Sequence, residues 1–204
     1  MGFVEIAAWF LAVFFSFVAV FYTFRLKAGA NSRQFLGQVG TQHWYGHVAF
    51  RFFRVLIWLV CVIRIPYNPV DQYLFIYDML MQPAVVYTGM ALMMAGFSLT
   101  VAGHFSLGEA WTSGINPEGP TEIKQTGIYH VSRNPMFIGV LVTQLGFFLT
   151  LPSGFTAMCL VIGYTAVLNQ VKLEEQFLTR RFGQRYQDYA REVPRWFGKA
   201  SFKS

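Results

Sequence analysis

The stretch that decides the fold is "GIYHVSRNPMFIGVLVTQLGFFLTL" (Gly127–Leu151), where an Arg-Asn-Pro step stands directly before sixteen uncharged residues. Asn is a preferred N-cap residue and Pro is a preferred first helical residue, so Asn134 and Pro135 predict a helix with a defined start. The apolar run approaches the roughly 20 residues that a helix needs to cross a bilayer. Because a helix start attracts anions and Arg133 adds a bidentate donor, we expect a membrane helix that begins at an anion-binding point.

The composition of the whole chain also indicates a protein that lies in a lipid bilayer. Of its 204 residues, 54% are hydrophobic and only 13% are charged, and the mean hydropathy is +0.40. These values lie outside the range of ordinary soluble domains. The sequence therefore predicts an all-α, multi-pass membrane helix bundle without a Rossmann domain, because no Gly-rich fingerprint follows a strand.

Hydropathy divides the chain into five expected membrane helices. The last two are joined by only Leu151-Pro152-Ser153-Gly154, so they must form an antiparallel hairpin. Small residues in the third helix offer surfaces for close helix approach. The five expected spans are Phe3 to Phe24, Val48 to Ile65, Gln82 to Phe105, Met136 to Leu151, and Phe155 to Val171, and the small residues are Gly89, Ala91, Ala95, Gly96 and Gly103.

Basic residues predict the orientation of this bundle. The first connection holds Arg25, Lys27 and Arg33, whereas the second, Pro66 to Met81, holds two aspartates and no Lys or Arg. The positive-inside rule then places the first connection and the C-terminal tail in the cytoplasm and the N-terminus outside. The net charge of +6 is explained by this topology and by attraction to anionic headgroups, so no nucleic-acid partner is expected.

Charged residues at the end of the fifth span complete a polar region. In "NQVKLEEQF", Glu174 and Glu175 follow a long apolar run, and the hairpin brings them close to Arg133 and the helix start at Pro135. Adjacent residues on a helix point about 100° apart, so the two glutamates should serve different partners. The alternative is a solvated helix end with a simple Arg–Glu bridge, in which Arg133 binds only lipid phosphate.

Other candidate ligands are weak. His43 and His47 are four residues apart and could face one metal ion, but no third ligand is near in sequence, so no metal site is predicted. Cys61 and Cys159 lie within apolar spans and are expected to be small buried hydrophobes. Arg64, near the end of the second span, is expected to reach an interface with its long side chain.

Several motifs in order resemble one family. "GIYHVSRNPMFIG" resembles the Gly-x-Tyr-x-x-x-Arg-His-Pro-Met-Tyr-x-Gly signature of the integral-membrane isoprenylcysteine carboxyl methyltransferases and their phospholipid methyltransferase relatives. Upstream, "HFSLGEAW" (His104 to Trp111) is similar to a His-x-x-Leu-Gly-x-x-Trp element. Downstream, the Glu-Glu pair and "FGQRYQDYAREVPR" (Phe182 to Arg195) resemble the family's last elements. The resemblance covers about residues 98–197, whereas residues 1–97 match only in being apolar.

The resemblance implies an S-adenosylmethionine-dependent methyltransferase. Residues 1–97 would be N-terminal transmembrane helices, and residues 98–204 a methyltransferase core with the cofactor site and a cytoplasmic tail. Arg133, Glu174 and Glu175 would be catalytic, with Arg133 and one glutamate facing the methyl acceptor. Two positions depart from the family pattern, since Asn134 replaces His and Phe137 replaces Tyr. The implied cofactor-binding residues are His104, Tyr129, Asn134, Pro135 and Met136, with one of Glu174 or Glu175, Glu174 being the first choice.

The methyl acceptor is left open by these residues. A lipophilic molecule entering from the bilayer is expected, with an isoprenylcysteine-like carboxylate, a lipid headgroup amine or a small thiol as the reacting group; membrane lipids are the other expected partners. Arg133 would hold an anionic acceptor, whereas Glu174 or Glu175 would suit an amine. Two alternatives remain, an NADPH-dependent membrane sterol-type reductase with a similar Arg-His-Pro region and a non-enzymatic membrane assembly or lipid-binding protein. The oligomeric state is not predicted.

Overall fold

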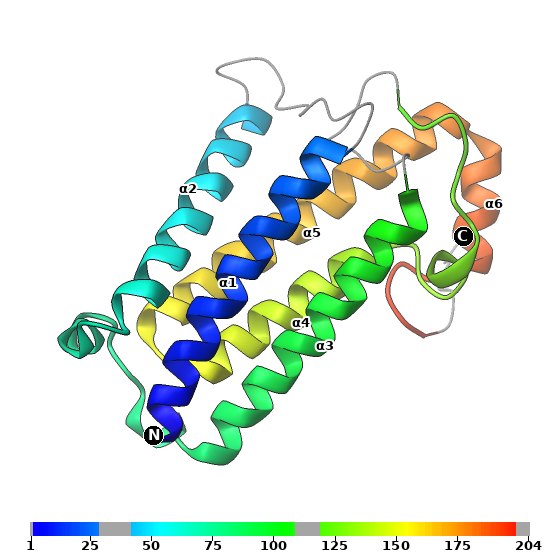
Figure 1. Cartoon of the computed structure of the whole chain (residues 1–204). Helices are drawn as coiled ribbons and strands as arrows, with labels where there is room; N and C mark the ends of the chain where they lie inside the picture. Colours follow the sequence, from blue (N-terminus) through cyan, green and yellow to red (C-terminus); the bar gives the residue numbers. More distant parts are fainter. Residues whose placement is uncertain (1, 29–41, 109–118, 199–204) are drawn as a thin grey trace.

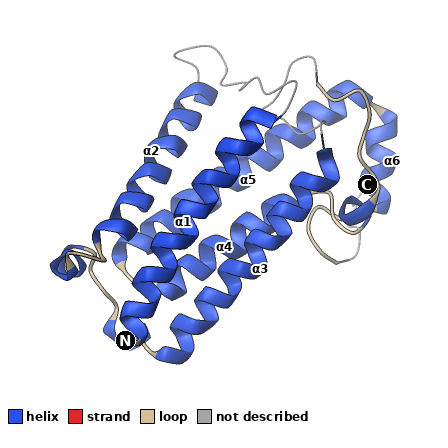
Figure 2. Cartoon of the chain, in the orientation of Figure 1, coloured by secondary structure: helices blue, strands red, loops and turns tan. Residues whose placement is uncertain are grey.

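A computed structural model describes residues 2–28, 42–108 and 119–198 of the chain. Within these ranges the secondary structure is helical, with one isolated bridge between Ile76 and Ser153 and no strand (Figure 2), so the expected all-α class is confirmed. The α-helices are α1 (Phe3–Ala28), α2 (Gln42–Ile63), α3 (Pro83–Leu107), α4 (Pro135–Thr150), α5 (Gly154–Phe182) and α6 (Gln184–Glu192), and the 3-10 helices are η1 (Asn68–Tyr73), η2 (Asp78–Leu80) and η4 (Gly127–His130).

Each of the five expected spans is a helix in the structure. Three described segments are long and apolar enough to cross a membrane, namely Phe3–Phe24, Pro83–Leu107 and Gly154–Phe182, while α4 is a shorter apolar helix of 16 residues. The fifth apolar span is expected to end at Val171 with Glu174 and Glu175 on the same helix, and α5 continues to Phe182. The added residues include Leu, Glu, Gln and Arg, which favour helix. The protein is therefore a membrane protein in which the two glutamates lie inside a long helix.

Helices α3 and α4 run antiparallel at backbone contact distance. A Cβ added to Gly96 would lie 2.6 Å from the carbonyl oxygen of Gly139, and one added to Gly103 would lie 2.8 Å from the Cβ of Met136. Only glycine allows such an approach, as expected for membrane helices. Of the expected small residues, Gly89, Gly96 and Gly103 face α4, whereas Ala91 and Ala95 are exposed. This packing fixes the start of α4 against the end of α3.

The turn between α4 and α5 forms the predicted hairpin and defines one end of the bundle, called here the hairpin end. A capping box joins Ser153 and Thr156 at the start of α5. Two backbone hydrogen bonds of 2.9 Å hold the turn, from the N–H of Gly154 to the carbonyl of Phe75 and from the N–H of Tyr77 to that of Pro152. The opposite end, where α4 begins and α3 ends, is called the site end (Figure 1).

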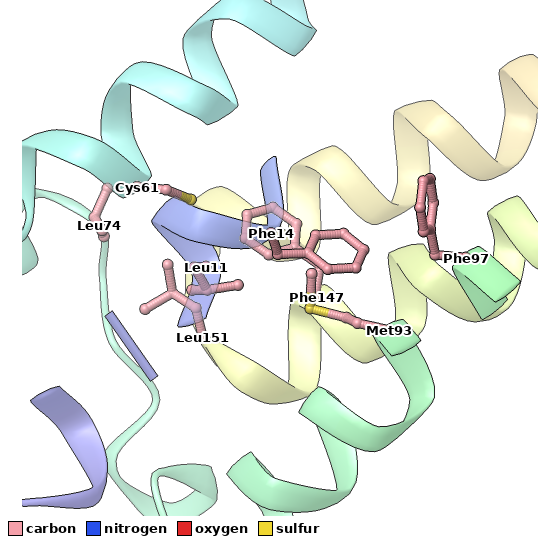
Figure 3. Packing of buried hydrophobic residues seen from close by; sticks show 8 residues of the cluster. All are labelled: Leu11, Phe14, Cys61, Leu74, Met93, Phe97, Phe147 and Leu151. Atoms are coloured by element: carbon pink, nitrogen blue, oxygen red, sulfur yellow. The ribbon is translucent and has the colours of Figure 1, made fainter. Parts of the chain in front are cut away.

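A hydrophobic cluster links the N-terminal helices to α3 and α4 (Figure 3). Phe14 of α1 packs edge-on against Phe97 of α3, with ring centroids 5.6 Å apart, and Phe15 packs against Phe147 of α4 at 4.9 Å. Cys61 and Cys159 are both free and buried, as expected. The cluster consists of Leu11, Phe14, Cys61, Leu74, Met93, Phe97, Phe147 and Leu151.

Arg64 has a buried partner that its sequence position does not predict. Its side chain is buried, with 3% exposure, at the hairpin end of the bundle. It forms a two-pronged pair with Asp71, from Nε to Oδ1 at 2.5 Å and from Nη2 to Oδ2 at 2.9 Å. The carboxylate follows seven residues later because η1 turns the chain back over the end of α2.

Candidate functional site

The start of α4 is polar, but its side chains act differently from the capping expectation. Asn134 occupies the N-cap position, and its side chain makes no capping hydrogen bond. Instead its Nδ2 donates to Oε1 of Glu175 at 3.0 Å and to the carbonyl of Arg195 at 3.2 Å. Its backbone N–H donates to Oγ of Ser132 at 3.1 Å. Asn134 therefore connects three segments, because a buried amide must find partners for its polar atoms.

Glu175 lies at the centre of this arrangement. Arg195 donates from Nε and Nη2 to Oε2 at 3.0 and 2.6 Å, and Nη2 of Arg133 lies 3.5 Å from Oε1. The hydrogen bonds to Glu175 raise the pKa of Arg195, although burial opposes this. We call Arg133, Asn134, Glu175 and Arg195 the Glu175 cluster. It holds two guanidinium groups for one carboxylate and so carries a surplus positive charge.

Arg133 is the buried cation of the cluster. Its side chain is only 9% exposed, and its backbone N–H donates to the carbonyl of Pro194 at 2.9 Å. Its Nε is buried and has no hydrogen-bond partner among the described residues. A buried guanidinium N–H without a partner costs free energy, about 1–3 kcal/mol for a typical polar group. Arg133 thus offers one donor for an anion beside the start of α4.

Glu174 faces a different surrounding. Its Oε1 accepts a hydrogen bond of 2.8 Å from Nε2 of Gln170, one turn earlier on α5. Burial raises the pKa of Tyr129, and the negative charge of Glu174 adds to that shift. The prediction that the adjacent glutamates have different partners is confirmed, since Glu175 contacts guanidinium groups and Glu174 an amide.

Three tyrosines at the site end are buried, Tyr129 on η4 and Tyr186 and Tyr189 on α6. The hydroxyl of Tyr189 donates to the backbone carbonyl of Tyr129 at 2.6 Å. Burial raises the pKa of Tyr189 to about 12, partly offset by the charge of Arg133, and burial also raises that of Tyr186. These phenols are neutral near pH 7 and can supply hydroxyl groups but no charge. Tyr186 and Tyr189 also pack with Ile123, Ala190 and Val193 in a small hydrophobic cluster.

His104 lies on the other side of the α4 start. It is 1% exposed at the end of α3, and its Nε2 lies 3.4 Å from the hydroxyl of Tyr22 on α1. The preceding residue, Gly103, contacts Met136 in the first turn of α4. The predicted site residues thus fall into three groups at one end of the bundle, which are the Glu175 cluster, the pair of Tyr129 and Glu174, and His104. Pro135 and Met136 lie between them along the start of α4.

Several residues of the site were not predicted as such. Arg195 belongs to the Val-Pro-Arg element but was given no role, and Ser132, whose Oγ donates to the carbonyl of Arg195 at 3.2 Å, was passed over. The Val-Pro-Arg motif was the signal available for Arg195. The side chains of His43 and His47 and the residue Trp111 lie outside the described part of the chain. Among the described residues no group of three or more His, Cys, Asp or Glu could hold a metal ion.

Comparison with known proteins places this site within a family match. The family model described as phospholipid methyltransferase matches residues 73–185, more than half of the chain. This confirms the resemblance seen in the motifs and extends it upstream to include all of α3. No curated protein and no solved structure matches the chain. Of the Glu175 cluster, only Arg195 lies beyond the matched residues.

Proposed function

Because this chain belongs to the phospholipid methyltransferase family and is a membrane methyltransferase, we propose that it transfers a methyl group from S-adenosylmethionine to a lipophilic acceptor at the site end of the bundle. The observation that carries the proposal is the Glu175 cluster, in which two guanidinium groups meet one carboxylate beside the start of α4. The match supplies the reaction class, and the cluster supplies an anion-binding point within it.

The residues at the site end fit the cofactor. S-adenosylmethionine supplies an electrophilic methyl group on a sulfonium, together with a carboxylate, an amino group and a ribose diol. The first backbone N–H groups of α4, after Asn134 and Pro135, suit the carboxylate, because a helix start favours anions. The Glu174 carboxylate, whose charge acts on the neutral phenol of Tyr129, suits the amino group or the diol. His104 and Met136 would flank the same helix start.

The acceptor would be oriented by the other side chains of the cluster. Glu175 holds the guanidinium of Arg133, and Arg133 would bind an anionic group of the acceptor through Nε. A carboxylate or thiolate needs no base during the transfer itself. An amine must lose a proton before it attacks, and Glu174 is the better base of the two glutamates because Glu175 is already held by guanidinium groups. In that case Glu174 serves the acceptor rather than the cofactor.

A binding and transfer experiment tests the proposal. The purified protein in detergent is titrated calorimetrically with S-adenosylmethionine, its demethylated product and NADPH. A tritiated-methyl assay then compares phosphatidylethanolamine, N-acetyl-farnesylcysteine and a long-chain thiol in mixed micelles. We expect S-adenosylmethionine and its demethylated product to bind, and one of the three acceptors to be labelled. Binding of NADPH alone would support the reductase alternative, and binding of none of the three would support an assembly protein.

We also propose that the site end faces the cytoplasm, with the N-terminus outside, and that residues 98–204 form the catalytic core over the N-terminal helices 1–97. The support is the Lys and Arg asymmetry of the connections. Two exposed residues report the two ends, Thr126 at the site end and Met79, 88% exposed, at the hairpin end. In a background with Cys61 and Cys159 replaced by Ala, a membrane-impermeant thiol reagent should label Met79→Cys in intact cells and label Thr126→Cys only after lysis. The reverse pattern would invert the topology.

A further inference from the structure

The helices outside the family match contribute a side chain to the site end. Helices α1 and α2 precede the matched residues 73–185, yet His104 of α3 packs against α1 rather than against lipid. The hydroxyl of Tyr22 lies 3.4 Å from Nε2 of His104, and the imidazole meets the rings of Tyr22 and Phe21 edge-on at 5.4 and 5.6 Å. The ring of His104 therefore has its orientation set by two residues of α1.

Tyr22 is itself held from α2. The guanidinium carbon of Arg54 lies 4.7 Å from the centroid of the Tyr22 ring, a cation–π distance. A cation over the ring withdraws electron density from the phenol and makes its O–H a better hydrogen-bond donor. The contacts thus run from Arg54 through Tyr22 to His104, across three helices. An imidazole that accepts at Nε2 keeps its proton on Nδ1 in the neutral form.

We infer that Tyr22 is a positioning residue of the cofactor site, which fixes the ring orientation and tautomer of His104 by donating its hydroxyl proton to Nε2. The inference rests on the proposed function, in which His104 contacts the cofactor. The backbone supports the placement, because Gly103 contacts Met136 in the first turn of α4 and so brings the neighbouring His104 to the helix start. The N-terminal helices then shape the site instead of serving only as membrane anchors.

Tyr22→Phe is the direct test, because it removes the hydroxyl and keeps the ring that contacts Arg54 and Phe21. We expect the Kd for S-adenosylmethionine to rise about 3- to 10-fold, the scale of one lost hydrogen bond. The kcat at saturating cofactor should stay within about twofold. In the His104→Gln background, Tyr22→Phe should add no further loss, since the two residues would act as one unit. The matched control is Tyr87→Phe, an exposed tyrosine of α3, which should bind the cofactor normally.

A spectroscopic readout separates this inference from the proposed function. In the protein labelled with nitrogen-15 at histidine, Tyr22→Phe should shift the Nε2 resonance of His104, assigned by its loss in His104→Gln, and leave the other histidines unchanged. Normal cofactor binding by the wild type with an unchanged Kd and an unchanged resonance in Tyr22→Phe would overturn the inference. An equal loss in the His104→Gln background would overturn it too, because Tyr22 would then act through packing. If the wild type binds no S-adenosylmethionine, the proposed function fails and the cofactor-site role of Tyr22 fails with it. The nitrogen-15 resonance of His104 still decides whether Tyr22 fixes the orientation and tautomer of the imidazole.

Discussion

The molecule buries charged side chains at both ends of its helical bundle, and the two sites differ in how their charges balance. At the hairpin end, Arg64 meets Asp71 with a fork of two hydrogen bonds, one cation to one anion, from residues seven apart. At the site end, Glu175 meets Arg133 and Arg195, two cations to one anion, from segments far apart in the sequence. The Arg64–Asp71 pair is neutral as a unit, whereas the Glu175 cluster has a net positive charge.

The comparison shows which feature of a buried charge points to a ligand. Each site has a buried guanidinium nitrogen without a partner among the described residues, Nη1 of Arg64 and Nε of Arg133. An unpartnered nitrogen therefore does not distinguish them. Charge balance and position do, because only the Glu175 cluster carries surplus charge, and only it stands beside a helix start within the family match. A balanced local pair can be complete in itself, whereas the buried guanidinium of Arg133 shares its carboxylate with the half-exposed Arg195 and can take a second anion.

The largest expected effect on methyl transfer is that of Glu175→Gln. Loss of the carboxylate leaves two guanidinium groups without their anion and releases the Arg195 segment from α5. We expect transfer to fall by at least about 100-fold and the midpoint of thermal unfolding to drop, because removing one partner of a buried pair leaves an uncompensated charge. The tritiated-methyl assay and a thermal melt in detergent measure both. Asp188→Asn, which breaks an exposed pair with Arg191 on α6, is the control. Full transfer by Glu175→Gln would remove the cluster from the mechanism.

Arg133→Lys should have the second-largest effect on methyl transfer. Lys keeps the charge but loses the planar fork and the Nε donor. We expect S-adenosylmethionine to bind within a few-fold of normal while transfer falls about 10- to 100-fold, the scale of a lost charge-assisted contact of about 1.5–3 kcal/mol. Calorimetry beside the transfer assay separates the two, with Arg191→Lys as an exposed control. Cofactor binding weakened more than 100-fold with normal turnover at saturating cofactor would reverse the assignment and place Arg133 on the cofactor.

Glu174→Gln should act on a different constant from Glu175→Gln. Glu174 accepts from an amide and its charge acts on Tyr129, so with a carboxylate or thiolate acceptor its loss should weaken cofactor binding by about 5- to 20-fold and leave the KM for the acceptor near normal. With an amine acceptor, for which Glu174 would be the base, turnover should fall instead. Glu175→Gln should instead raise the KM for the acceptor along with its loss of turnover. Steady-state kinetics with each substrate varied in turn measure this. Identical effects of the two variants, or full activity in Glu174→Gln, would contradict separate roles.

The helices were predictable because their signals are local. The apolar lengths gave five helices, the four-residue turn gave the hairpin, and the 100° step between neighbours gave Glu174 and Glu175 different partners. The resemblance was confirmed by the family match. The roles of the individual site residues remain predictions.

The unpredicted contacts join segments that no periodicity connects. Arg195 reaches Glu175 only because α6 folds the tail back onto the α4 start. Asn134 stays at the N-cap position without a side-chain capping hydrogen bond, because its Nδ2 donates to Glu175 and to the carbonyl of Arg195. Arg64 is buried because η1 returns Asp71 to it, whereas its sequence position alone favoured an interface. Burial of a polar side chain depends on its partner, and a single sequence does not show which distant residue that partner is.

Asp71→Asn should have the smallest effect on transfer and is the sharpest test of the comparison. Arg64 lies outside the family match at the hairpin end, so the loss of its carboxylate partner should lower the free energy of unfolding by about 2 kcal/mol, after allowance for the partial exposure of Asp71, and with it the midpoint of thermal unfolding. Transfer per folded molecule should stay within about twofold. The double variant Arg64→Met with Asp71→Leu, which removes both charges, should recover part of the lost stability because no buried cation is left without its anion. If Asp71→Asn instead reduced transfer as strongly as Glu175→Gln while the protein stayed folded, charge balance would not separate a structural pair from a functional cluster in this molecule, and Arg64 would have to be assigned to the site as well.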